Sequence, residues 1–327
     1  MKTFVVANPN AGACKVERNW KAFARAITSA FGPTDVHFTR GPGDATERVR
    51  IALHEGFERV ILVGGDGTCN EGLNGFFAAE GGAPINADAS MSIFPAGTGG
   101  DFPRSIGLRT RDVTEAYKKS SDRCIDVGRA TFVDDSGKET RRYFLNISSA
   151  GVSGEVVDRV NNSSKRLGGR ASFVMGTVRG LLAYRNQRVR LQVDDTIDEE
   201  MLINLIAVAN GRYFGGAMKI APTAVLNDGL LDVVALGDVG LSQFARYAGR
   251  LYKGTHIGMP HVRQWQGKVV TITPIGPKPV RIDLDGEGPG ILPVRYEVVP
   301  KALLFFAPWE QAEALGYEGD RQTAVQG

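Results

Sequence analysis

The sequence predicts an α/β fold in two parts, in which an N-terminal doubly wound parallel sheet is followed by a β-rich, sandwich-like domain. Strand-like segments, glycine-rich loops and helix-like segments alternate up to about residue 120, which is typical of a parallel sheet with helices on both faces. Beyond residue 122, short strand-like runs punctuated by proline and glycine dominate. A length of 327 residues exceeds one ordinary core and favours two domains.

The N-terminal part is expected to cover residues 1–122. Strands are expected at 2–7, 35–39, 59–63 and 92–95, and helices at 20–31, 45–55 and 70–79. Asp44 suits the N-cap of the second helix, and Glu47, three residues on, completes a capping-box pattern. Ligands in such sheets bind beyond the carboxyl ends of the strands, where the glycine loops of this chain lie.

The C-terminal part is expected to cover residues 123–301, with 302–315 packing back on the first domain. Its strand-like runs lie at 125–133, 142–149, 188–194, 202–209, 230–236, 268–273, 279–284 and 294–299. Helices are expected near 170–185 and 241–253. The frequent proline and glycine between these short runs indicate a turn-rich β domain.

Composition and charge exclude several classes of protein. A net charge of +3 is too small to indicate a nucleic-acid partner, and no uncharged run approaches the length of a membrane-spanning helix. The start of the chain has too few apolar residues for a signal peptide, so a cytoplasmic protein is expected. Cys14, Cys69 and Cys124 form no CxxC pair, and the histidines form no metal-ligand cluster.

The strongest single motif is VGGDGTCNE at residues 63–71. A buried strand leads into a tight glycine turn and a helix N-terminus, where the backbone can approach phosphate oxygens and free N–H groups favour anions. Asp66 would repel a phosphate unless a divalent cation lay between them. The motif therefore indicates a Mg²⁺–nucleotide site, and a simple strand–turn–helix with a capping aspartate is the alternative.

A second glycine loop, PAGTGGDF, covers residues 95–102 after the next strand. It fails the dinucleotide pattern GxGxxG because Phe102 occupies the sixth position. The stretch GRLYKGT at 249–255 is not followed by the lysine and serine or threonine of a P-loop, and the sequence has no GxSxG elbow. These absences weaken dehydrogenase, P-loop and hydrolase interpretations.

Three carboxylates stand close together at Asp283, Asp285 and Glu287, at the end of a strand-like run. Strand alternation would place them on one side if the strand continued, although Gly286 is expected to end it. Crowded carboxylates raise one another's pKa, which suits a general base near neutral pH. An acidic turn on a solvated edge is the alternative.

The segment LNDGLLD at residues 226–232 places an Asn-Asp-Gly turn between apolar runs. Such a turn is ordinary and by itself favours no function. Its functional alternative is a bound Mg²⁺, because turns supply carbonyl oxygens beside an aspartate.

Residues 159–190 contain eight lysines or arginines and no acid, and an apolar helical stripe runs through them. One interpretation is a helix that packs its stripe on the sheet of the second domain. The other is a peripheral contact with an anionic membrane surface.

Taken together, these motifs resemble the soluble diacylglycerol kinase catalytic family, which includes the sphingosine and ceramide kinase branches. The resemblance spans about residues 3–306, and GGDGT alone is shared with NAD kinases and phosphofructokinases. The later motifs separate this chain from those families. The matching elements are Asn8-Pro9-x-x-Gly12, Gly64–Thr68, residues 97–102, the run NGRYFGGAMKIAPTAVLNDGLLDV at 210–233, and Leu284–Glu287.

The resemblance implies a two-domain ATP-dependent lipid kinase with the nucleotide in the cleft between the domains. Glu287 and Asp285 match the acidic pair that supplies the base, with Glu287 preferred, and Asp66 belongs to the phosphate region. Asp228, with the carbonyls of Val225 and Leu230, matches a structural Mg²⁺ site. ATP contacts are implied at Asn8, Thr39, Gly65, Asp66, Gly67, Thr68, Cys69, Asn70, Glu71, Thr98 and Asp101.

The chain departs from the family pattern at Gly100 and Pro103, where asparagine and alanine are usual. The expected reaction transfers the γ-phosphate of Mg·ATP to a hydroxyl of a membrane lipid, with diacylglycerol as the first choice. The alternatives are a ceramide or sphingoid-base kinase, a small-molecule kinase similar to NAD kinases, and a non-catalytic nucleotide or lipid sensor. A peripheral contact with the inner face of the membrane and a homodimer are left open, and no nucleic-acid partner is expected.

Overall fold

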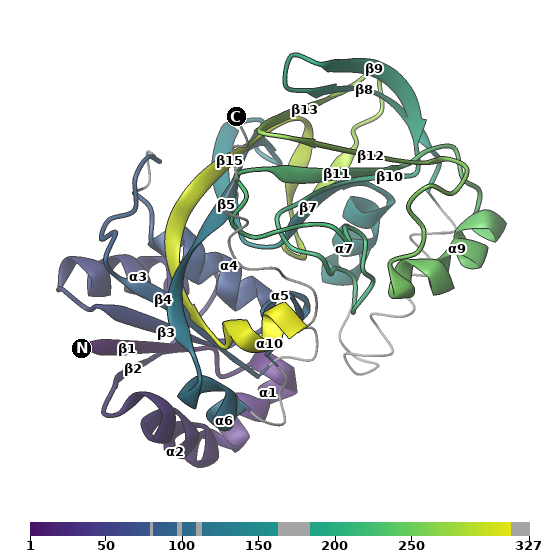
Figure 1. Cartoon of the computed structure of the whole chain (residues 1–327). Coiled ribbons are helices and arrows are strands. Elements are labelled where there is room, and N and C mark those ends of the chain that lie inside the picture. The colour runs from purple at the N-terminus through teal and green to yellow at the C-terminus, as the bar shows by residue number, and fades with distance from the viewer. Residues whose placement is uncertain (79–80, 97–99, 109–112, 163–183, 315–327) are drawn as a thin grey trace, which may run out of the picture. The chain divides into compact units, whose positions relative to one another are not determined.

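The computed structural model describes residues 1–78, 81–96, 100–108, 113–162 and 184–314 (Figure 1). Contacts divide the chain into two compact units. The first unit comprises Met1–Val127, Val225–Gly229 and the chain from Val299 onward. The second comprises Gly128–Ala224 and Leu230–Val298.

The first unit contains the predicted parallel sheet. Its strand order is β15, β4, β3, β1, β2, and every neighbouring pair is parallel. Every residue of β3 and β4 is buried, as expected of central strands in a parallel sheet that is covered on both faces. These strands are β1 (Thr3–Ala7), β2 (Asp35–Phe38), β3 (Arg59–Gly64), β4 (Ser90–Pro95) and the C-terminal residues of β15 (Glu287–Ala307).

Helices connect these strands, and α2 and α3 confirm the helices predicted at 20–31 and 45–55. The predicted capping box is wrong, because α3 begins at Asp44 itself, after the left-handed Gly43, and has no side-chain cap. The Asp44 carboxylate instead accepts the Arg40 N–H at 2.8 Å and contacts His37 Nε2 at 2.9 Å. The helices are α1 (Ala11–Arg18), α2 (Trp20–Phe31), α3 (Asp44–His54), α4 (Asp66–Gly75), α5 (Asp101–Ser105), α6 (Val113–Lys118) and α10 (Trp309–Ala314).

The second unit is formed by antiparallel strands, which confirms the predicted β-rich domain. Its longest run is β12 (Val262–Gly267), β11 (Leu231–Leu236), β10 (Leu205–Ala209), β7 (Ile147–Gly151), β14 (Arg281–Leu284) and β15, side by side in that order. The other strands are β5 (Ser121–Asp134), β6 (Glu139–Phe144), β8 (Gln187–Val193), β9 (Ile197–Ile203) and β13 (Val269–Pro274). Their inward side chains share one apolar core that includes Phe144, Ile206 and Tyr296.

Two helices of the second unit lie within the described residues. Helix α7 (Val152–Asn162) follows β7 directly, and α9 (Leu241–Lys253) follows β11. Helix α9 packs Tyr247 and Leu251 into a second apolar cluster. It confirms the helix predicted at 241–253, whereas the helix expected near 170–185 falls mostly on 163–183, outside the described residues.

One short segment lies in a different unit from the one expected. Residues 225–229 fall in the predicted β-rich range, but they belong to the first unit. The fully buried Asp126 holds them there, because its Oδ2 accepts the Gly229 N–H at 2.6 Å. Its Oδ1 accepts the Lys301 N–H at 2.7 Å, and its own N–H donates to the Leu226 carbonyl at 2.6 Å. One internal carboxylate therefore ties three segments of the chain together.

Candidate active site

The first glycine motif forms the turn from β3 into α4, as predicted. Strand β3 ends at Gly64, Gly65 is extended, and α4 begins at Asp66. Gly64 is required here because a Cβ at this position would lie 2.5 Å from the Thr68 side chain. The helix therefore starts at the turn, where its first N–H groups have no partner within the helix. Buried residues near the start of α4 include Thr68, Cys69 and Asn70.

Asn8 joins this turn to the loop that follows β1. Its Nδ2 donates to Thr68 Oγ1 at 3.1 Å, and its Oδ1 accepts the Asn10 N–H at 3.0 Å. Its backbone N–H donates to the Val63 carbonyl at 2.9 Å. One amide side chain therefore fixes two loops that the sequence assigned to ATP binding.

The chain shortly after β1 makes a left-handed turn. Gly12, Ala13 and Cys14 have φ values of 62°, 59° and 63°. This conformation costs a non-glycine residue roughly 1–2 kcal/mol. A Cβ at Gly12 would lie 2.4 Å from the Ala96 carbonyl oxygen, so only glycine allows this approach to the second glycine loop. Arg18 supports the turn by donating to the Ala13 carbonyl at 2.7 Å and the Cys14 carbonyl at 3.3 Å.

The acids of the two glycine motifs lie side by side. The Asp101 N–H donates to Asp66 Oδ2 at 3.4 Å, and the Asp101 carboxylate pairs with Arg104 at 3.2 Å. Helix α5 begins after Gly100, whose φ of 72° and ψ of 44° are left-handed. Glycine and asparagine adopt this conformation most readily, so Gly100 can replace the usual asparagine without changing the backbone. Thr98 lies outside the described residues.

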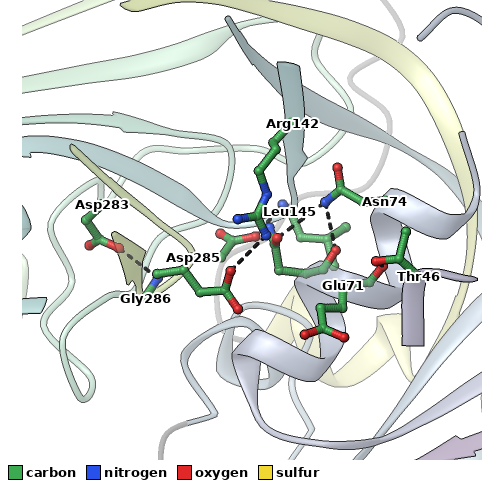
Figure 2. Close-up of polar contacts among 10 residues, drawn as sticks. Thr46, Glu71, Asn74, Arg142, Leu145, Asp283, Asp285 and Gly286 are labelled. Atoms are coloured by element: carbon green, nitrogen blue, oxygen red, sulfur yellow. Dashed lines mark hydrogen bonds and ion pairs between the residues drawn. The ribbon is translucent and has the colours of Figure 1, made fainter. Parts of the chain in front are cut away.

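Thr39 and Glu71 are also at the carboxyl side of the sheet. Thr39 follows β2, and its N–H donates to the Ala7 carbonyl at 2.9 Å. Glu71 lies on α4, where its carbonyl accepts the Thr46 hydroxyl at 2.7 Å (Figure 2). The predicted residues that follow the ends of β1, β2, β3 and β4 are Asn8, Thr39, Gly65–Glu71 and Asp101.

The acidic motif of the second unit forms a two-residue hairpin turn. Leu284 pairs with Glu287, and the intervening Asp285 and Gly286 have φ values of 49° and 89°. Positive φ at both central residues is typical of a type I′ turn, for which Asp-Gly is a preferred pair. The turn ends the strand as expected, so alternation does not determine where the acids point. Glu287 is the first residue of β15.

The Asp285 carboxylate is occupied by backbone groups. Its Oδ2 accepts the Leu145 N–H at 2.8 Å, and its Oδ1 accepts the Asn146 and Ile147 N–H groups, each at 3.0 Å. Its own N–H donates to the Ile147 carbonyl at 3.0 Å. Asp285 therefore ties the hairpin turn to the start of β7, and Figure 2 shows it beside Leu145 and Gly286.

Glu287 has different surroundings. Its Oε2 pairs with Arg142 Nη2 from β6 at 2.8 Å, and its side chain remains 33% exposed. Among the described residues, its Oε1 has no hydrogen-bond partner. Glu287 is thus an oriented carboxylate with one oxygen available.

Asp283 is the acid of this motif to which the sequence gave no separate role. Its Oδ1 accepts the Gly286 N–H at 2.8 Å (Figure 2), and its Oδ2 accepts the Ser149 hydroxyl at 3.2 Å. The pKa of Asp283 is raised to about 7, mainly by burial and also by the charges of Asp285 and Glu287, while its two hydrogen bonds oppose the rise. A raised pKa is therefore found at Asp283, and burial contributes more to it than the crowding of carboxylates that the sequence suggested.

The predicted metal ligands at 225–230 stay a prediction. No group of three or more His, Cys, Asp or Glu side chains able to hold a metal is found among the described residues. The predicted set contains the Asp228 carboxylate and the carbonyls of Val225 and Leu230, an all-oxygen set of the kind Mg²⁺ prefers. Sequence analysis missed Asp126, which fixes this segment through Gly229.

The basic segment 159–190 lies largely outside the described residues, which omit 163–183. Of its described arginines, Arg190 lies on β8 and pairs with Asp198. The lipid contact expected of this segment stays a prediction. Among the described residues, no helix is long and apolar enough to span a membrane.

Two family models match the chain, one in each half. The diacylglycerol kinase catalytic domain matches residues 2–130, and the YegS C-terminal NAD kinase beta sandwich-like domain matches residues 146–307. A diacylglycerol kinase of Bacillus subtilis (strain 168) is 28% identical over 312 residues, which cover 95% of this chain and 98% of that protein. A diacylglycerol kinase of Mycobacterium tuberculosis (strain ATCC 25618 / H37Rv) is 28% identical over 268 residues, covering 81% and 82%.

Solved structures share the fold. A crystal structure of a diacylglycerol kinase from Bacillus anthracis str. Sterne aligns with a TM-score of 0.67 at 22% identity, covering 94% of this chain and 96% of that one. A crystal structure of yeast NADH kinase complexed with NADH aligns with a TM-score of 0.50 at 10% identity, covering 99% and 90%. At these identities the similarity concerns the fold alone.

Proposed function

Because this chain belongs to the soluble diacylglycerol kinase catalytic-domain family, we propose that it transfers the γ-phosphate of Mg·ATP to a hydroxyl of diacylglycerol. The relatives that align with most of its length are named diacylglycerol kinase, which supports a lipid kinase with an alcohol acceptor. The observation that carries the proposal is Glu287, an oriented carboxylate with one oxygen available, next to the two-residue hairpin turn.

The first unit supports the nucleotide part of the proposal. The glycine turn and the start of α4 offer backbone N–H groups and the positive end of a helix dipole to phosphate groups. The Asp66 carboxylate lies at this turn and accepts the Asp101 N–H, and a carboxylate oxygen there suits a divalent cation. Bound Mg²⁺ would neutralise charge on the phosphoryl group during transfer.

Glu287, rather than Asp285, is the proposed general base. A base needs an oxygen within reach of the hydroxyl proton. Asp285 uses both oxygens to accept backbone N–H groups, and a proton on either oxygen would face those donors. Glu287 keeps Oε1 available while Arg142 fixes Oε2.

In the proposed step, the acceptor hydroxyl gives its proton to Glu287 as its oxygen attacks the γ-phosphorus. The bond from the γ-phosphorus to the bridging oxygen of ATP breaks, and ADP leaves. A general base typically contributes about 10²–10⁴-fold, and positioning supplies most of the remaining acceleration.

Radiolabelled ATP and a panel of acceptors test the proposal. Diacylglycerol, ceramide and sphingosine are offered in mixed micelles, and NAD is offered in buffer. Label is expected in diacylglycerol, and Asp66→Ala is expected nearly to abolish transfer, whereas the exposed control Asp88→Ala retains it. Preferential labelling of ceramide or sphingosine would show that this lipid, and not diacylglycerol, is the acceptor. Labelling of NAD, or binding of nucleotide without any phosphate transfer, would overturn the proposal of a lipid kinase.

A further inference from the structure

Helix α9 carries a one-sided set of exposed cations and lies at the outside of the second unit (Figure 1). Arg246, Arg250 and Lys253 are exposed, and spacings of four and three residues put them on one helix face. Tyr247 and Leu251 point instead into the apolar cluster that the helix covers. The α9 surface denotes Arg246, Arg250 and Lys253, and the exposed Tyr252 lies about 100° around the helix from Lys253.

These cations have no acidic partner in the part of the chain that the structure describes. Helix α9 itself contains no Asp or Glu. The α9 surface therefore presents three clustered positive charges to solvent without an acid beside them among the described residues. Arg190 and Arg263, two other exposed arginines of this unit, pair instead with Asp198 and Glu199.

The helix dipole accounts for only part of this arrangement. Cations in the last turn interact favourably with the negative end of a helix, and the effect fades beyond that turn. Arg250 and Lys253 lie in the last turn, before the C-cap Gly254. Arg246 lies one turn further from the C-terminus and gains little there. The helix dipole therefore gives no reason for the charge at Arg246.

Apolar groups accompany the cations. Tyr252 keeps 53% of its surface exposed, although it is a large aromatic residue. The loop 214–218 forms a tight hairpin, in which Phe214 and Met218 exchange backbone hydrogen bonds of 2.9 and 3.0 Å. Both of these side chains are half-buried against the cluster that α9 covers.

The hairpin loop and the helix are in contact. The Lys219 N–H donates to the Leu251 carbonyl at 2.9 Å. A Cβ at Gly254 would lie 2.9 Å from Lys219 Cδ, so the lysine side chain runs along the end of α9. Lys219 thereby adds another cation next to the α9 surface.

The same loop is tied to the acidic hairpin. Asn146 Nδ2 donates to the Tyr213 carbonyl at 2.6 Å, and the Asn146 N–H donates to the Asp285 carboxylate at 3.0 Å. Asn146 therefore connects the loop beside α9 with the turn that precedes Glu287. A partner bound at the α9 surface would therefore contact a region that is connected through Asn146 to the turn before the proposed base.

We propose that the α9 surface docks on the anionic headgroups of a lipid bilayer. The proposal rests on the proposed function, which needs an acceptor from a membrane, and it specifies which face of the second unit meets that membrane. Cations flanked by an exposed tyrosine and an apolar hairpin suit a lipid surface, where the headgroups attract the charges and the interface accommodates the ring. Nucleic acid is a separate outcome of the test.

Vesicle cosedimentation of the full chain without ATP tests the docking surface. Vesicles of phosphatidylcholine with phosphatidylglycerol are compared with vesicles of phosphatidylcholine alone. The double variant Arg246→Gln, Arg250→Gln is expected to bind the anionic vesicles roughly tenfold to thirtyfold more weakly, which corresponds to about 1 kcal/mol for each charge. The control Lys268→Gln, Lys278→Gln removes the same charge from exposed lysines of the same unit and is expected to bind nearly as the unchanged chain does.

Equal vesicle binding by the two double variants would overturn the proposal, as would absence of vesicle binding by the unchanged chain. If the Arg246→Gln, Arg250→Gln variant bound duplex DNA or RNA more weakly but bound vesicles as the unchanged chain does, the partner of the α9 surface would be nucleic acid and not a lipid bilayer. Both double variants are expected to phosphorylate short-chain diacylglycerol in detergent micelles normally. If the unchanged chain phosphorylates no acceptor but binds vesicles through α9, the proposed function fails and the docking surface stands.

Discussion

Arg142 Nη2 lies 2.8 Å from Glu287 Oε2, so strand β6 directs the carboxylate that begins β15. The two side chains are 25% and 33% exposed, and ion pairs at such exposure contribute little to stability. The pair instead orients the Glu287 side chain, because it fixes one carboxylate oxygen and leaves the other available. Arg142 is therefore a positioning residue for the proposed base.

Arg142→Gln is expected to lower kcat about tenfold and to leave the KM for ATP and the melting temperature nearly unchanged, because a misdirected base slows the proton transfer. Steady-state kinetics in mixed micelles and thermal melting provide the measurement. Arg281→Gln is the control, since Arg281 forms a comparable pair with Asp135 at 3.0 Å in the same unit. An equal loss of kcat in both variants would show that Arg142 has no special role.

Glu287→Gln and Asp285→Asn are expected to separate catalysis from stability. Glu287→Gln removes the proposed base and should lower kcat by about 10²–10⁴-fold without lowering stability. Asp285→Asn puts an amide N–H₂ against backbone donors, and an unsatisfied buried donor costs roughly 1–3 kcal/mol. Urea denaturation and single-turnover kinetics measure the two effects. The reverse pattern, with stability lost at Glu287 and catalysis lost at Asp285, would make Asp285 the base.

The central strands of the first unit could be predicted because the apolar residues that indicate each strand lie within that strand. The expected runs 59–63 and 92–95 fall within β3 (Arg59–Gly64) and β4 (Ser90–Pro95), whose residues are all buried. The first glycine turn is equally local, since Gly64 must make room for Thr68 four residues later. These features depend only on residues that are close to one another in the sequence, so a local sequence motif contains all of them.

The features that sequence analysis missed depend on distant partners. The role of Asp285 is set by backbone donors 138 to 140 residues away. Asp126 binds Gly229 and Lys301, which are 103 and 175 residues away. The left-handed turn at Ala13 and Cys14 had no local signal, because neither residue type favours that conformation.

Arg18→Gln is expected to raise the KM for ATP about threefold with little change in kcat, because Arg18 supports a strained loop that the proposed nucleotide would contact. Loss of its two hydrogen bonds leaves the left-handed Ala13 and Cys14 free to relax. ATP titrations at saturating acceptor measure the effect. The control is Arg25→Gln, another exposed arginine of the first unit. An unchanged KM in Arg18→Gln would separate this turn from nucleotide binding.

Asp283 should make the stability of the protein depend on pH near neutrality. Burial raises its folded pKa to about 7 from a usual 3.8. Between these values the folded chain holds a proton that the unfolded chain has released, so folding becomes less favourable as pH rises through this window. The contribution of Asp283 to the free energy of unfolding is therefore fully present below the pKa it has in the unfolded chain. It is lost as the pH rises through the pKa it has in the folded chain. From about pH 5.5 to about pH 7.5 the loss amounts to about 2 kcal/mol.

Asp283→Asn is expected to remove this dependence, because the amide is close in shape but does not titrate. Its carbonyl oxygen can still accept the Gly286 N–H, and its N–H₂ can donate to Ser149 Oγ. The free energy of unfolding, measured by urea denaturation, should therefore fall with pH in the unchanged chain more steeply than in the variant. Parallel pH profiles would mean that Asp283 keeps an ordinary pKa. Asp283→Ala, which leaves both partners unsatisfied, should be less stable than Asp283→Asn at every pH, since the hydrogen bonds hold the turn whatever the charge on the acid.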